Sequence, residues 1–339
     1  MASRNVQTGF PRASGWSRLL KLAERIVPRQ ATDGDDDVAN GGWQAEVLRE
    51  GPLQRRFETE GYVRLPPLDQ DSLAALQEQA PGLLPGEMWS PAAAGSQYHC
   101  SFMHADEERR SRVQEVFAPV FEAYVREHLK GYRVLHAALH VKPPGGGRLP
   151  LHMNWSSVAD LNQSTVTLWC PLVDVGPKNG TLEVVPRSHR ITRRIEDMTP
   201  RYFDAYRDLL SGMAVAQSAR AGEVVLMEDT LLHQSQSNRS NQPRIAAQIV
   251  CVPDTATTVF YYEATPELYE VIEADRDFFV RFDISSVQVR QEGWRSLGFV
   301  RRPDDSLDAA ECLRRMKNPA EIRRGGFRLE PVAGGSEAL

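Results

Sequence analysis

Hydrophobic positions follow a helical period early in the chain and a strand period from residue 132 onward. Between residues 106 and 129 the apolar side chains recur three and four residues apart, which predicts one long helix with a bend at Pro119. A shorter helix is predicted over residues 71–79, because Pro81 and Gly82 follow it. Ahead of both, residues 57–65 predict a turn of helix, a glycine and a short strand.

A period of two begins at Tyr132. Over residues 132–142 apolar side chains alternate with a row that includes His136, His140 and Lys142, which predicts a half-buried strand. Lys178–Gly180 has the composition of a hairpin turn. Further strands are predicted over residues 165–173, 181–185, 222–227, 244–252 and 259–262, the last of the series. Many short strands separated by turns indicate a β-sandwich or a barrel with a functional mouth.

Composition divides the chain into three parts. Residues 1–43 form a predicted flexible tail, with a basic start, a short amphipathic helix that stops at Pro28, and then an acidic run. Residues 44–262 form the main domain. Residues 263–339 form a mixed segment with helices predicted at 266–275 and 306–317, which we expect to cover the barrel or to form a homodimer contact.

Charge and cysteine content exclude some classes of partner. The net charge of −5 gives no global basic footprint, so we expect no nucleic-acid partner. No apolar run approaches the roughly 20 residues of a membrane span. The four cysteines are widely spaced, without a CxxC pair, which favours a reducing compartment and predicts a cytoplasmic location.

The candidate chemistry centres on two histidines and one arginine. His152 follows a glycine-rich turn and His233 follows a predicted strand, so both are placed to bind one metal ion at the mouth of a barrel. Two imidazoles and a carboxylate on one face of iron(II) leave positions open for a co-substrate and oxygen. Arg244 would then hold the carboxylate of that co-substrate as a fork. Asn154 stands where the metal-binding carboxylate is expected.

Four further side chains are candidates for the substrate pocket. His136 and His140 share one face of their strand with Lys142, and Gln248 alternates with Arg244. Asp160 would reach the metal only if its loop folded back. The competing interpretation is a satisfied core histidine for the first two, an outward-facing amide for Gln248 and a solvated loop residue for Asp160.

These motifs together resemble the phytanoyl-CoA dioxygenase-like iron(II)/2-oxoglutarate oxygenases over residues 53 to 262. The resemblance is carried by 57–63, by 142–147, by Leu151–Trp155, by Leu168–Val175, by Asn179–Arg190 and by 221–226, and it ends with His233 and Arg244. It implies a mainly β fold, a double-stranded β-helix (a cupin-like jelly roll) surrounded by α-helices. It also implies iron(II), 2-oxoglutarate and oxygen as cofactor and co-substrates.

The resemblance also implies roles for individual residues. His152 and His233 match the iron-binding histidines, and Asn154 falls where the family has its aspartate. Arg244 matches the arginine that pairs with 2-oxoglutarate, assisted by Ser235. Two more side chains, Trp169 and Met153, fall where the family lines the co-substrate pocket.

Three functions stay open from the sequence. The first is an oxygenase that hydroxylates a small organic molecule with release of succinate and CO2. The second is a halogenase-type variant, in which the missing carboxylate frees a site for chloride, although asparagine is bulkier than the small residue such enzymes carry there. The third is a non-catalytic binding or partner relative that keeps the barrel.

Overall fold

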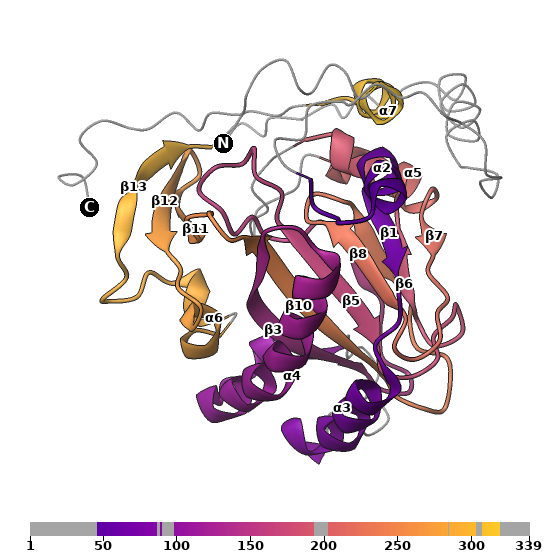
Figure 1. The fold of residues 1–339 in the computed structure, drawn as a ribbon. Coiled ribbons are helices and arrows are strands. Elements are labelled where there is room, and N and C mark those ends of the chain that lie inside the picture. Colours follow the sequence, from indigo (N-terminus) through magenta and orange to yellow (C-terminus); the bar gives the residue numbers. More distant parts are fainter. Residues whose placement is uncertain are drawn as a thin grey trace, which may run out of the picture.

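Two antiparallel sheets form the centre of the protein (Figure 1). The computed structural model describes residues 46–86, 89, 98–192, 203–283, 285–302 and 307–318. The larger sheet has the order β1 (Tyr62–Leu65), β8 (Val224–Glu228), β5 (Val166–Pro171), β10 (Arg244–Pro253), β3 (Tyr132–Lys142), β2 (His99–Cys100). The smaller has the order β4 (Leu149–His152), β9 (His233–Ser235), β6 (Leu182–Val184), β7 (Val215–Ala216). Their inner faces share one apolar cluster, in which Trp169 and Ala246 of the larger sheet meet Leu182 and Val184 of the smaller. This is the expected jelly roll.

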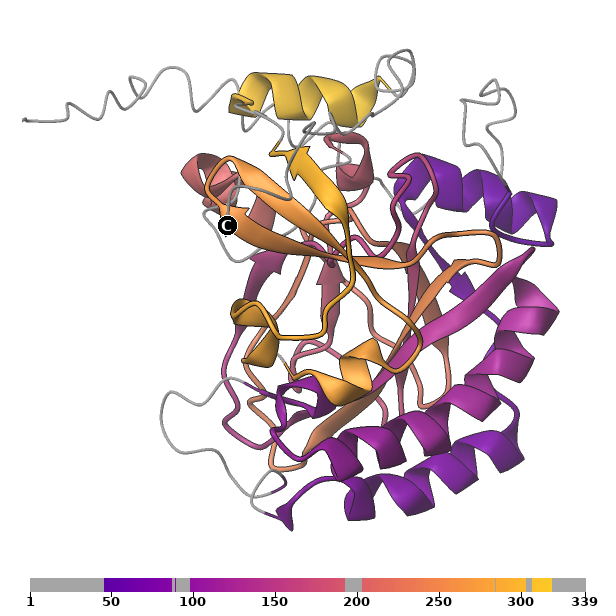
Figure 2. The ribbon, with the colours of Figure 1, turned by 90° about the vertical axis from the view of Figure 1, so that its left-hand side faces the viewer.

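Helices cover the outer face of the larger sheet. In Figure 2, α3 (Gln70–Leu83) and α4 (Glu107–His128) lie side by side along this face. Phe117 and Phe121 of α4 pack in one core with Leu139 and Ile249 of the sheet. A shorter helix, α2 (Gly51–Glu60), precedes β1 as predicted.

The helix predicted over residues 106–129 is confirmed, with Pro119 inside it and Asp106 accepting a hydrogen bond from the Arg109 backbone N–H. The shorter helix continues beyond its predicted end and includes Pro81. Ala80 and Leu83 are buried in the helix–sheet core, and this packing outweighs the local preference to stop.

The alternation predicted over residues 132–142 is confirmed in β3. Ala137, Leu139 and Val141 face the helices, whereas His136 and His140 face the space between the sheets. The neighbouring β10 pairs with β3 from end to end, apart from one bulge. The inward side chains of both strands therefore form one continuous wall.

The C-terminal part departs from prediction. Residues 266–275 are not a helix, because β12 (Leu268–Glu273) is the middle strand of a sheet with β11 (Val259–Thr265) and β13 (Ser296–Arg301). Tyr269 and Val271 pack in one cluster and Ile272 in another on the opposite face, so the period is two. Strand β11 is consequently not the last strand.

The second C-terminal helix is confirmed as α7 (Ala309–Lys317), which buries Cys312, Leu313 and Met316 against Leu151 and its neighbours. The remaining helices, α5 (Arg207–Ser211) and α6 (Phe278–Arg281), are short. The predicted N-terminal helix lies outside the described residues. Within the described ranges, no helix has the length and apolar character needed to cross a bilayer.

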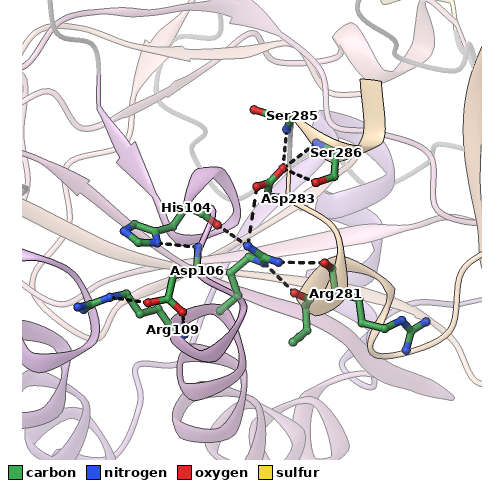
Figure 3. A network of polar contacts seen from close by, with 9 residues as sticks. His104, Asp106, Arg109, Arg281, Asp283, Ser285 and Ser286 are labelled. Carbon is green, nitrogen blue, oxygen red and sulfur yellow. Dashed lines mark hydrogen bonds and ion pairs between the residues drawn. The ribbon is translucent and has the colours of Figure 1, made fainter. Parts of the chain in front are cut away.

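Arg110 ties α6 to the start of α4. Its buried guanidinium donates to the Val280 carbonyl (2.7 Å), to the Arg281 carbonyl (3.0 Å) and to the His104 carbonyl. The Asp283 carboxylate lies 4.0 Å away and itself accepts hydrogen bonds from the next turn of chain. Figure 3 shows His104, Arg281 and Asp283 meeting in this network. One side chain therefore joins three segments.

We expect Arg110→Met to lower the free energy of unfolding by about 3 kcal/mol, because it leaves three carbonyl oxygens without their donor and the Asp283 carboxylate without its nearby cation. Urea denaturation followed by circular dichroism measures the change. The matched control is Arg109→Met on the exposed side of α4, where loss of one ion pair with Asp106 should cost less than about 1 kcal/mol. Equal losses in the two variants would contradict this role for Arg110.

Candidate functional site

His152 and His233 lie opposite each other on adjacent strands. They are Cα partners in the β4–β9 ladder, and their ring centroids are 4.1 Å apart. Each Nδ1 lies 2.8 Å from a backbone carbonyl two residues earlier, that of Pro150 or that of Leu231. A carbonyl accepts and does not donate, so each Nδ1 carries the hydrogen and each Nε2 keeps its lone pair. This tautomer is the one that binds metals through Nε2.

Asn154 stands beside the histidine pair, and its amide group is held in one orientation. Its Nδ2 donates to Thr167 Oγ1 (3.0 Å) and to Asp229 Oδ1 (3.3 Å), while its Oδ1 accepts from Gln248 Nε2 (3.4 Å). The backbone N–H of Asn154 also donates to the Asp229 carbonyl at 2.8 Å. The amide nitrogen therefore donates toward Thr167 and Asp229, and the amide oxygen accepts from Gln248, which lines the cavity.

No carboxylate completes the histidine pair. Across the described residues, no three His, Cys, Asp or Glu side chains are grouped so that they could hold a metal ion. Asp229, which contacts Asn154, is buried and does not line the cavity. Burial raises the pKa of Asp229 to about 8, against the opposing hydrogen bond from Thr167.

Arg244 is a buried cation with unused hydrogen-bond donors. It is only 4% exposed, its guanidinium lies 5.9 Å from the centre of the Trp169 ring, and its Nε and Nη1 have no partner in the described part of the chain. Burial lowers the pKa of Arg244 to about 10, so it remains charged at neutral pH. A buried charge without a partner is costly, and an anionic ligand would supply that partner.

Lys142 lies opposite Arg244 in the β3–β10 ladder and is fully buried. Its Nζ donates to Ser235 Oγ (2.7 Å) and to the Gln236 carbonyl. Burial, reinforced by Arg244, lowers the pKa of Lys142 to about 6. Gly180 closes over this contact with φ of 72°, and a Cβ there would collide with the Gln236 oxygen. The lysine is thus enclosed by a turn that requires glycine.

His152, His233, Asn154 and Arg244 line one cavity of about 420 Å³ between the sheets, within the usual size range of small-molecule pockets. Of the residues predicted from sequence, the cavity is lined by His152, His233, Asn154, Arg244, Ser235, Trp169, Met153, His136, His140 and Gln248. Asp160 does not line it, and its loop does not fold back. Its side chain is exposed and accepts hydrogen bonds from Asn162.

The model of the phytanoyl-CoA dioxygenase (PhyH) family matches residues 57–246, more than half of the chain. The chain belongs to the phytanoyl-CoA dioxygenase family. It is therefore a non-haem iron(II)- and 2-oxoglutarate-dependent dioxygenase, with iron(II), 2-oxoglutarate and oxygen as its cofactor and co-substrates. Enzymes of this family act on small molecules.

Two solved structures similar to this PhyH-family chain are the carbocyclase SnoK and EctD. The non-heme alpha ketoglutarate-dependent carbocyclase SnoK from nogalamycin biosynthesis is 26% identical, with a TM-score of 0.47, over 62% of this chain and 86% of that one. EctD from S. alaskensis, solved with 2-oxoglutarate and 5-hydroxyectoine, is 18% identical, with a TM-score of 0.48, over 77% of this chain and 97% of that one. No curated protein matches the chain.

Within the PhyH-family site, sequence reasoning missed the positions of Asp229 and Lys142 relative to the other groups. Asp229 stands four residues before His233, between Glu228 and Thr230, so its neighbours in the sequence give no sign that its side chain is buried beside Asn154. Lys142 was placed on the correct strand face, but its register opposite Arg244 depends on the β3–β10 pairing.

Because Lys142 is buried, the free energy of unfolding of this PhyH-family protein should depend on pH. Its pKa is about 6 in the folded protein and near 10.5 when unfolded, so between these values the unfolded state binds the extra proton. The stability of the wild type relative to Lys142→Met should therefore rise with pH from about 6.5 to 9, by up to about 1.4 kcal/mol per unit. Urea unfolding of the two ligand-free proteins at several pH values measures this difference in stability. A difference that does not change with pH would mean that the folded protein keeps Lys142 charged.

Proposed function

We propose that this protein hydroxylates a small organic molecule, with iron(II) held by His152, His233 and Asn154 Oδ1, and with the far carboxylate of 2-oxoglutarate on Arg244. The observation that carries the proposal is that two imidazoles in the metal-binding tautomer face the same cavity as a buried guanidinium with two unpartnered donor nitrogens. When bound, iron(II), 2-oxoglutarate and oxygen supply the oxidising chemistry, with succinate and CO2 as co-products.

The remaining cavity residues would bind and orient the co-substrate. Ser235 adds a hydroxyl next to Lys142, and Trp169 lies under the Arg244 guanidinium. With Met153 they form the wall at the arginine end of the cavity. A dicarboxylate at this end would form an ion pair with Arg244 and so offset the free energy lost by burying its charge.

Asn154 fits the third ligand position because its hydrogens point elsewhere. An amide that offered its NH2 group to the metal would repel it, but the Asn154 nitrogen donates to Thr167 and Asp229 instead. The oxygen that remains is a suitable though neutral ligand for iron(II). In this arrangement Asp229 acts through Asn154 as a positioning residue.

The alternatives receive less support. A halogenase-type site needs room for chloride at position 154, whereas the Asn154 side chain fills this position and is held by three neighbours. The two unpartnered donors on the buried cation fit anion binding with or without turnover, and the family match favours an enzyme over a non-catalytic relative. Formation of succinate from 2-oxoglutarate separates turnover from simple binding, and chlorinated product in chloride buffer identifies a halogenase. The homodimer contact and the cytoplasmic location stay predictions.

Arg244→Lys should weaken 2-oxoglutarate binding by about 1–3 kcal/mol, because the charge is kept but the planar fork is lost. Calorimetric titration of the Mn(II)-loaded protein without oxygen measures the affinity. Arg148→Lys is the matched control, since Arg148 donates to Ser211 and Gln234 and does not line the cavity. An unchanged affinity in Arg244→Lys would remove 2-oxoglutarate from this position.

Asp229→Leu should weaken Mn(II) binding about tenfold, because the Asn154 amide loses one of the acceptors that orient it. Asp229→Asn keeps an acceptor oxygen and should stay within about threefold of the wild type. Electron paramagnetic resonance of free Mn(II) gives both affinities without requiring turnover. If the asparagine variant loses as much as the leucine variant, the carboxyl group of Asp229 itself is required and an acceptor oxygen at this position is not sufficient.

A further inference from the structure

The wall formed by β3 and β10 carries basic side chains at one end and uncharged side chains at the other. Arg244 and Lys142 are paired at one end, and Val250 and His136 are paired six residues farther along. At 3.2–3.4 Å per residue this is about 20 Å of strand. Gln248, between the two ends, donates to Asn154. The His136 end is therefore separated from the co-substrate end by the residues proposed to hold the metal.

His136 is a buried polar group without a partner. It is 9% exposed, it lines the cavity, and neither ring nitrogen makes a hydrogen bond in the described part of the chain. Burial, with the nearby charge of Arg110, lowers the pKa of His136 to about 4, so the imidazole is neutral and offers one donor and one acceptor. Buried polar groups are normally satisfied. Arg244 shows the same deficit at the other end of the same cavity.

The surroundings of His136 are aromatic. The centre of the Phe102 ring lies 5.9 Å from that of His136, 5.6 Å from that of Trp155 and 5.7 Å from that of Phe279. The ring centres of Phe279 and His136 are 5.4 Å apart. Phe102 and Trp155 are only partly buried and line the cavity. Edge-to-face rings of this kind favour a flat or cyclic apolar ligand.

This end of the cavity carries no charge of its own. Among the described residues that line the cavity, Arg244 alone is permanently charged, and it belongs to the opposite end. An ionised group buried beside His136 would lack a counter-charge. A cationic ligand would in addition be repelled by Arg110, whose positive charge contributes to the lowered pKa of His136.

We propose that the aromatic subsite formed by His136, Phe102, Trp155 and Phe279 binds the substrate to be oxidised, and that this substrate is an uncharged, mainly apolar ring compound with a hydroxyl or carbonyl group hydrogen-bonded to His136. This rests on the proposed function, because it takes the arginine end for 2-oxoglutarate. The imidazole can donate to a carbonyl or accept from a hydroxyl, and the rings supply the apolar contact.

Arg110 contributes to this subsite as a positioning residue. The segment η2 (Ser101–Met103) carries Phe102, and α6 carries Phe279. Arg110 hydrogen-bonds to the carbonyl of His104, just after η2, and to the carbonyls of Val280 and Arg281 in α6. It thereby holds the two phenylalanines against each other without touching the ligand.

The test uses 1-naphthol as a probe, on the full chain loaded with Mn(II) and 2-oxoglutarate without oxygen. Calorimetric titration should show that neutral 1-naphthol binds at least about tenfold more tightly than the 1-naphthoate anion, which brings an uncompensated charge. His136→Phe should weaken 1-naphthol binding about three- to tenfold and leave 1-methylnaphthalene unchanged, because only the hydrogen bond is lost.

Two further variants complete the test. His136→Gln restores a donor and an acceptor and should recover most of the 1-naphthol affinity. His128→Phe, on α4 and away from the cavity, is the matched control and should change nothing. Should His136→Phe fail to fold, the comparison of His136→Gln with His136→Leu replaces it. Circular dichroism reports folding for each variant.

The outcomes separate this inference from the proposed function. Equal binding of 1-naphthol and 1-naphthoate, or 1-naphthol binding that does not depend on position 136, overturns the aromatic subsite. The affinity for 2-oxoglutarate is measured on the same proteins and should not depend on position 136. If the wild type binds no 2-oxoglutarate, the proposed function fails whatever the probes do. If the wild type binds 2-oxoglutarate but its affinity for 1-naphthol does not depend on residue 136, only the inference of the aromatic subsite fails.

Discussion

The antiparallel pairing of β3 with β10 is the constraint on which the rest of the site depends. It sets Arg244 against Lys142 and Val250 against His136, and of these four Arg244, Val250 and His136 line the same cavity. A slip of one residue would turn every one of these side chains toward the helices and bring Leu139 and Val141 into the cavity. The helix-facing core therefore fixes the register of the polar wall.

Much of this wall could be predicted from the sequence, because alternation is a local property. The pattern over residues 132–142 identified the face that carries His136 and His140, and several motifs together, among them Asn179–Arg190, identified the family. The strand β12 was missed because Leu268, Tyr269, Val271 and Ile272 fit a short helix as well as a strand that is buried on both faces. Only pairing with β11 and β13 decides between them.

Asn154 shows where sequence comparison by position falls short. Seen alone, asparagine in place of aspartate looks like a lost ligand. In the fold, Thr167 and Asp229 come from distant strands and loops to accept its amide hydrogens, so the neighbours match an asparagine. An aspartate there would set two carboxylates against each other in a buried pocket. The change at position 154 and the acid at position 229 have to be considered together.

Each of the two ends of the cavity contains a buried polar side chain without a hydrogen-bond partner, Arg244 at one end and His136 at the other. Each such group lowers the stability of the ligand-free protein, so its persistence is explained best by a ligand that pairs with it. An anion would pair with Arg244, and a neutral hydrogen-bonding group would pair with His136, since the surroundings of His136 disfavour either charge. In the proposed arrangement the cavity takes two chemically different ligands at its two ends, with the histidine pair and Asn154 between them. An enzyme that oxidises a substrate together with a co-substrate has to bind the two compounds at separate positions on either side of its metal.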